Sequence, residues 1–131
     1  MSRERLIYII VFCLYIMAVA FLCFARPDDM PQLPTLWFGL PADKVGHFLM
    51  FVPFPILAYS VFHKDNVSLV KHLLMVLILM IVGMGMAIAT EQIQAQLAYR
   101  TAELDDFHAD LAGLAAGSAS TVAFIIFRRN R

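Results

Sequence analysis

Charged side chains are scarce in this sequence of 131 residues. Only 15% of the residues are Asp, Glu, Lys or Arg, whereas 61% are hydrophobic, and both shares depart from those of ordinary soluble domains. Ten basic residues balance ten acidic ones, so the chain has no formal net charge. The lack of a basic excess argues against a nucleic-acid partner, and the lack of a charged block argues against a long disordered tail.

Cysteine is also scarce. The two cysteines, Cys13 and Cys23, lie ten residues apart in one hydrophobic run, a spacing too wide for a disulfide within one helix. The sequence therefore contains no disulfide framework, and its cysteines leave the redox compartment open.

The hydrophobic residues fall into four runs, each long enough to cross a bilayer as a helix. Pro53 and Pro55 interrupt the second run, because proline lacks a backbone N–H, and neighbouring helices can absorb the resulting kink. We therefore predict an all-α integral membrane protein, a single four-transmembrane-helix bundle over residues 1–131. Its helices are expected at about 6–24, 45–62, 73–94 and 106–127.

The first run begins after Arg3 and Arg5, as the hydrophobic part of a secretory signal peptide does. It is longer than a usual signal core, however, and Ala25, Arg26 and Pro27 follow it in place of a small-residue cleavage motif. We expect it to be retained as the first transmembrane helix.

Lysine and arginine are divided unevenly between the two sides of the predicted bundle. Seven fall on the side of the termini and three on the other. The positive-inside rule therefore predicts an N-in/C-in topology and places the acid-rich side outside. The seven are Arg3, Arg5, Lys64, Lys71, Arg128, Arg129 and Arg131, and the three are Arg26, Lys44 and Arg100.

Polar residues recur at helical spacing on the predicted outer side, where residues three and four positions apart share a helix face. Small residues lead to polar ones on two of these faces, and small residues let helices approach closely in lipid. We therefore predict that the third and fourth helices touch, with Gly113 and Gly117 against the third. The three faces are Asp43 and His47 beside Lys44; Gly83, Ala87, Glu91 and Gln94; and Asp106, Asp110, Gly113 and Gly117.

Several of these residues also have a purely structural interpretation. Asp43 follows Pro41 and is placed to cap the second helix. Lys44 is placed to extend its ammonium group to the membrane interface. Glu91 and Arg100 would close the bundle if they paired with each other.

The two aspartates of the last helix have a structural interpretation as well, because the helix dipole favours Asp106 and Asp110 near its start. His47 is harder to explain in this way. It lies one turn inside a hydrophobic run, where ionisable groups usually face a cavity or a partner. His63 and His72, on the side of the termini, are interpreted as loop and interface residues.

Two motifs on the predicted outer side resemble those of the VanZ-like membrane proteins. The first, Asp43-Lys44-x-x-His47-Phe48, opens the second helix. The second motif is Glu91-x-x-Gln94 followed at the family's spacing by Arg100, Asp106, Asp110, Gly113 and Gly117. The chain departs from the family within this second motif, at Asp110, where asparagine is common, and this difference adds a negative charge.

The resemblance implies a bacterial inner-membrane protein of the cell envelope, linked to glycopeptide (teicoplanin) resistance, with no biochemical mechanism attached. Its partners would be membrane lipids, together with a lipid-linked cell-wall precursor or the glycopeptide itself. An oligomer is compatible with the same residues.

The first functional hypothesis is a binding protein for a lipid-linked or phosphorylated headgroup. Arg100 and Lys44 would hold the phosphate, the arginine through its bidentate fork and the lysine as a point charge. The other ligand-binding candidates of this outer site are Asp43, Gln94 and Asp110.

The second hypothesis is a hydrolase or transferase that acts on the same class of lipid headgroup. His47, Glu91 and Asp106 would then be the catalytic residues, since an imidazole and a carboxylate can serve as acid and base. In a variant, these residues hold a divalent metal, whose identity the residue types do not specify. The third hypothesis is an accessory structural subunit, whose polar residues only lock the bundle.

Overall fold

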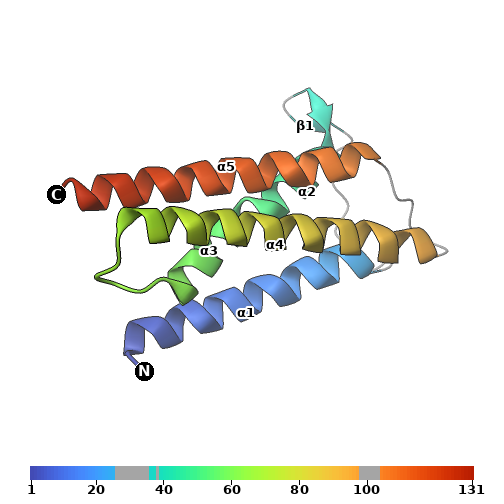
Figure 1. The fold of residues 1–131 in the computed structure, drawn as a ribbon. Coiled ribbons are helices and arrows are strands. Elements are labelled where there is room, and N and C mark those ends of the chain that lie inside the picture. The colour runs from blue at the N-terminus through green and yellow to red at the C-terminus, as the bar shows by residue number, and fades with distance from the viewer. Residues whose placement is uncertain (26–35, 38, 98–103) are drawn as a thin grey trace.

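The computed structural model describes residues 1–25, 36–37, 39–97 and 104–131, and its helices run lengthwise beside one another (Figure 1). The prediction of an all-α protein with four helices able to span a membrane is confirmed, since α2 and α3 follow one another as a single span. The helices are α1 (Arg3–Phe24), α2 (Ala42–Phe51), α3 (Pro53–Phe62), α4 (Leu69–Gln96) and α5 (Leu104–Arg129).

Two of the spans begin at serine caps. The Ser2 hydroxyl accepts a hydrogen bond from the Arg5 backbone N–H at 3.2 Å, and Ser68 accepts one from the Lys71 N–H at 3.4 Å. A capping hydroxyl satisfies an amide that has no partner within the helix. Helices α1 and α4 therefore start a few residues ahead of the hydrophobic runs from which they were predicted.

The second span is interrupted at Val52, where α2 ends and α3 begins. Pro53 occupies the first turn of α3, a position that tolerates its missing N–H. The interruption predicted from the two prolines is therefore present. Helix α2 packs mainly on α5, whereas α3 packs on α1, α4 and α5.

A short antiparallel pair of strands, β1 (Leu36–Trp37) and β2 (Leu40–Pro41), precedes α2. Gly39 turns the chain between the strands with a φ of 76°, a conformation that glycine adopts without steric cost. Strand β2 ends at Pro41, and α2 begins at the next residue, Ala42.

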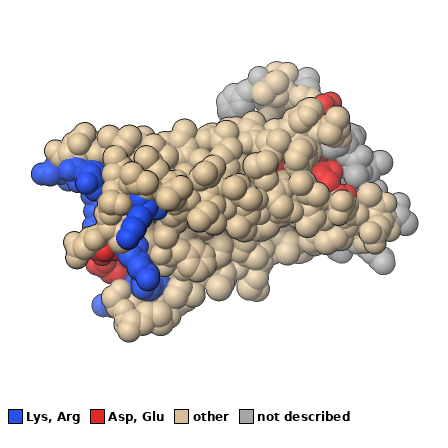
Figure 2. Space-filling view, in the orientation of Figure 1, with Lys and Arg blue, Asp and Glu red and all other residues tan. Residues whose placement is uncertain are grey.

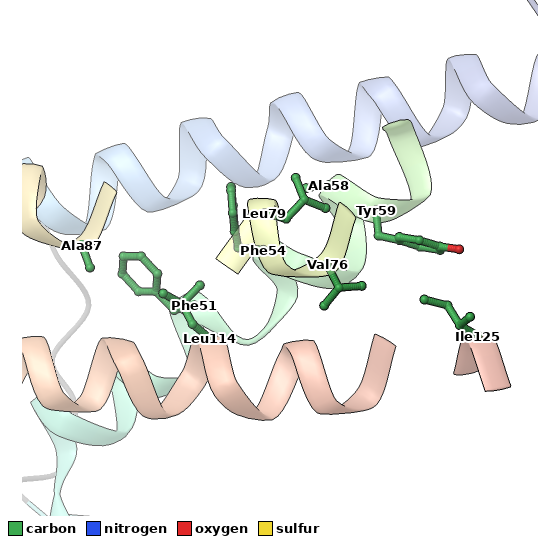
Figure 3. Packing of buried hydrophobic residues seen from close by; sticks show 9 residues of the cluster. All are labelled: Phe51, Phe54, Ala58, Tyr59, Val76, Leu79, Ala87, Leu114 and Ile125. Atoms are coloured by element: carbon green, nitrogen blue, oxygen red, sulfur yellow. The ribbon is translucent and has the colours of Figure 1, made fainter. Parts of the chain in front are cut away.

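The hydrophobic core lies between α3, α4 and α5, and Phe51, the last residue of α2, also contributes to it (Figure 3). Helix α1 contributes little, since only Val19 and Cys23 are buried along it. Large apolar side chains elsewhere on all four spans are exposed, as expected for surfaces in contact with lipid tails. The core residues are Phe51, Phe54, Ala58, Tyr59, Val76, Leu79, Ala87, Leu114 and Ile125.

The glycine face of α5 packs differently from the prediction. A Cβ atom at Gly113 would overlap the Phe48 carbonyl, and one at Gly117 would overlap the Val52 carbonyl. Both glycines therefore lie against the second span, and their predicted packing against α4 is wrong. Helical spacing identifies a face that needs close approach, but it does not identify the neighbour.

Charge is separated along the bundle. Figure 2 shows lysine and arginine side chains gathered at the end that carries both termini, with an acidic patch beside them, and further acidic side chains at the opposite end. This separation matches the sequence pattern from which the N-in/C-in topology was predicted. The topology itself remains a prediction.

Candidate functional site

The motif residues meet at the end of the bundle opposite the termini. Helices α2, α4 and α5 each contribute to the group, although more than sixty residues of sequence separate His47 from Asp110. We refer to the group as the acidic cluster. It consists of Asp43, Lys44 and His47 from α2, Glu91 and Gln94 from α4, and Asp106 and Asp110 from α5.

His47 and Asp110 form the innermost pair of the cluster. The Asp110 carboxylate accepts a hydrogen bond from His47 Nδ1 at 2.7 Å. Asp110 is fully buried, and only 9% of the His47 surface is exposed. A carboxylate bound to one ring nitrogen fixes the orientation of an imidazole and directs the other nitrogen elsewhere. Asp110 therefore positions the ring so that Nε2 points away from it.

His47 Nε2 faces a second carboxylate, that of Asp106. It lies 3.6 Å from Asp106 Oδ2, which is longer than a hydrogen bond. One ligand atom from each of His47, Glu91 and Asp106 lies within 4.8 Å of the others. An imidazole nitrogen and two carboxylate oxygens from three different helices thus converge on one small volume, close enough together that they could hold a metal ion.

Lys44 lies between two aspartates. Its ammonium group forms an ion pair with Asp43 at 3.1 Å and a second, shorter one with the buried Asp106. Pro41 occupies the N-cap position of α2 without a side-chain hydrogen bond, so the interpretation of Asp43 as a helix cap is wrong. Lys44 connects the cluster to its exposed rim.

Gln94 ties the cluster to the first span. Its side-chain N–H donates to the Cys23 carbonyl at 2.8 Å. Among the described residues, Gln94 Oε1 and Asp110 Oδ2 are buried and have no hydrogen-bond partner. Buried acceptors in folded proteins are nearly always satisfied by a proton donor, water or an ion. These two oxygens are therefore acceptors that a proton donor could satisfy.

The described part of the site has an excess of negative charge. Four carboxylates, those of Asp43, Glu91, Asp106 and Asp110, face one lysine and one histidine. Neighbouring carboxylates repel unless protons or cations offset their charge. Arg100, which was predicted to lie beside them, is outside the described residues.

A hydrophobic groove adjoins the cluster. It lies between α2 and α5, has a volume of about 570 Å³, and is apolar apart from Lys44. Because Lys44 lines this groove and also binds Asp106, the groove and the polar site are adjacent. Its lining residues are Leu40, Pro41, Lys44, Val45, Phe48, Leu49, Ala109 and Ala112.

Two contacts that support the site had little signal in the sequence. The Cys23 carbonyl accepts a hydrogen bond from the Gln94 side chain, and the Tyr15 hydroxyl donates one to the Met50 carbonyl within α2. Both acceptors are backbone atoms, which any residue type supplies. Only the presence of Tyr15 inside a hydrophobic run gave a hint, since a buried tyrosine hydroxyl usually finds a partner.

The fold and the site together define a class, that of small four-helix membrane proteins with a buried histidine–carboxylate cluster at one end. The sequence profile of the VanZ/LLP1 family matches residues 6–128. The match covers nearly the whole chain, so the protein belongs to this family. Searches of curated proteins and of solved structures find no match.

Proposed function

We propose that the acidic cluster binds the phosphorylated headgroup of a lipid through a divalent cation held by His47, Glu91 and Asp106. The observation that carries this proposal is the convergence of their ligand atoms within 4.8 Å. Imidazole and carboxylate ligands suit several divalent metals, so the proposal specifies the ligands and leaves the metal to experiment.

The negative charge of the site favours the binding of a cation over direct binding of a phosphate. Four carboxylates would repel an anionic headgroup, and the Lys44 ammonium is already paired with Asp43 and Asp106. A divalent cation offsets the carboxylates and offers open positions to phosphate oxygens, as cations with few protein ligands commonly do. Asp110 would support the site from behind, because a carboxylate that orients a ligating histidine strengthens metal binding.

The hydrophobic groove supports a lipid as the ligand. Lys44 is shared by the groove and the cluster, so an alkyl chain in the groove would bring its headgroup to the polar residues. A soluble phosphate ester would leave these apolar surfaces uncovered. Under the predicted topology the headgroup would lie in the outer leaflet, where a lipid-linked cell-wall precursor would account for a role in teicoplanin resistance in a bacterial inner membrane.

A second candidate function is hydrolysis or group transfer at the same headgroup, and the His47–Asp110 pair favours it. A buried carboxylate on one imidazole nitrogen lets the other nitrogen accept and return a proton. In this alternative His47 Nε2 acts on the substrate, while Glu91 and Asp106 hold or neutralise charge. A third alternative, an accessory structural subunit, requires no ligand at the cluster.

Calorimetric titration of the purified protein in neutral detergent with Mg²⁺, Mn²⁺ and Zn²⁺ tests the proposal. His47→Ala and Asp106→Asn should each weaken binding by at least about tenfold, since even an outer-shell change commonly costs that much. Matched controls are His108→Ala and Asp105→Asn, whose side chains are 62% and 79% exposed on the same helix as Asp106. Equal titrations for the wild type and both cluster variants would contradict the cation site.

A second assay tests the headgroup and separates binding from catalysis. Phosphatidic acid, with diacylglycerol as the control, should bind in a manner that depends on the metal and on His47. Phosphate release that is abolished by His47→Ala would favour the enzyme. Stable, metal-dependent binding without release would favour the binding protein, and the absence of both would leave only the structural role.

A further inference from the structure

A polar cavity lies at the end of the bundle opposite the acidic cluster, near both termini (Figure 1). It has a volume of about 480 Å³ and lies between the end of α3, the loop that follows it, and helices α4 and α5. Basic side chains surround this end (Figure 2). We call it the basic cavity, and its polar lining includes Tyr59, His63, Asp65, His72, Arg128 and Arg129.

Aromatic side chains form an ordered wall of the basic cavity. The Tyr59 hydroxyl lies 2.8 Å from His72 Nδ1, within hydrogen-bond distance across α3 and α4. The Tyr59 ring also stacks on His63, with 5.1 Å between ring centroids and an interplanar angle of 15°. Arg5 from α1 donates to the His63 carbonyl at 2.9 Å. Three spans thus hold this wall in place.

The Asp65 carboxylate lies where a bound anion would face the basic side chains of the cavity. One of its oxygens lies 3.8 Å from His63 Nε2 and 3.9 Å from the Arg128 guanidinium. Both distances exceed hydrogen-bond length, and the Asp65 side chain is 72% exposed. Two potential donors therefore face one loosely held carboxylate, which a better-fitting anion can displace.

A smaller apolar cavity continues from the basic one. It has a volume of about 270 Å³ and shares Tyr59, His63, Phe124 and Arg128 with it. Phe124 is apolar and 55% exposed. A ligand with a charged group and an adjoining alkyl chain therefore fits the two cavities together better than a small soluble anion does.

We propose that the basic cavity binds the phosphate of an anionic glycerophospholipid in the leaflet at the end that carries the termini. Arg128, Arg129 and His63 surround the phosphate, and the acyl chain follows Phe124 into the smaller cavity. Basic pockets between transmembrane helices are suited to such headgroups. This site is independent of the acidic cluster, because the two lie at opposite ends of the bundle and share no residue.

Native mass spectrometry of the full chain, released from neutral detergent with phosphatidylglycerol or phosphatidylcholine added, tests the proposal. Phosphatidylglycerol should bind preferentially. Arg128→Gln and Arg129→Gln should each weaken it about fivefold, the usual contribution of one basic residue near anionic lipid. Arg131→Gln is the matched control, since Arg131 stacks on Phe127 outside the cavity. Circular dichroism checks that each variant is folded.

Asp65→Asn supplies a variant with the opposite expected sign. Removing the competing carboxylate should tighten phosphatidylglycerol binding, again by about fivefold. Equal losses in Arg128→Gln, Arg129→Gln and Arg131→Gln would overturn the proposal in favour of diffuse surface charge. Competition by glycerol 3-phosphate or inorganic phosphate at the concentrations of the lipid would also overturn it, by assigning the cavity to a soluble phosphate.

Discussion

The two ends of the bundle both gather ionisable side chains, but they do so in opposite ways. At the acidic cluster, His47 and Asp110 are buried and 2.7 Å apart. At the basic cavity, Asp65 and Arg128 are 72% and 63% exposed and 3.9 Å apart. Burial obliges charges to pair closely, because an unpaired charge away from water is costly. Exposure leaves them free to exchange partners.

This difference suggests that the acidic cluster would bind a ligand through fixed geometry, and the basic cavity mainly through charge. The acidic cluster is held by contacts from all four spans, including Gln94 on Cys23 of α1, so its ligand atoms are preorganised. The basic cavity has an ordered aromatic wall but loosely held ions. Substitutions should therefore disrupt folding and binding together at the first site, and change mainly affinity at the second.

The largest expected effect is at Asp110. Replacing Asp110 with alanine should lower the free energy of unfolding by about 3 to 5 kcal/mol, because it leaves a buried His47 without its partner. Asp110→Asn should be much milder, since the amide oxygen can still accept from Nδ1. This variant also restores the residue that the VanZ-like resemblance favours. Thermal unfolding in detergent measures both, and equal losses in the two variants would show that the charge itself is required.

A smaller effect is expected at Tyr59, a buried residue of the opposite end. Tyr59→Phe removes the hydroxyl that contacts His72 and should cost about 1 kcal/mol, the usual value for one hydrogen bond. The stacking on His63 is retained. Tyr8→Phe, at an exposed position of α1, is the control and should leave the unfolding temperature unchanged. A loss at Tyr59 as large as that at Asp110 would remove the contrast between the two ends.

Much of the architecture follows from periodic features of the sequence. Run length predicts the four spans, and the two prolines predict the interruption at Val52. Helical spacing predicts that Glu91 and Gln94 share a face, and the motif spacing of the VanZ-like proteins adds that His47 and Asp106 belong to the same site. The structure brings His47, Glu91 and Asp106 together.

Other features could not be read from the sequence because they depend on tertiary neighbours. Gly113 and Gly117 were predicted to pack on α4, whereas they lie against the second span, where the Phe48 and Val52 carbonyls come close. His63 and His72 were interpreted only as loop and interface residues, because nothing in the spacing brings them both to Tyr59. Local spacing determines which residues share a helix face, but the packing of the whole bundle determines which helix that face contacts.

Pulsed electron paramagnetic resonance of bound Mn²⁺ can determine whether His47 is a ligand of the cation proposed for the acidic cluster. A histidine nitrogen bound to Mn²⁺ gives a hyperfine coupling that water and carboxylate ligands do not give. We expect this coupling in the wild type and in His108→Ala, and its loss in His47→Ala. Bound Mn²⁺ without nitrogen coupling, or a coupling that survives His47→Ala, would rule out His47 as a ligand.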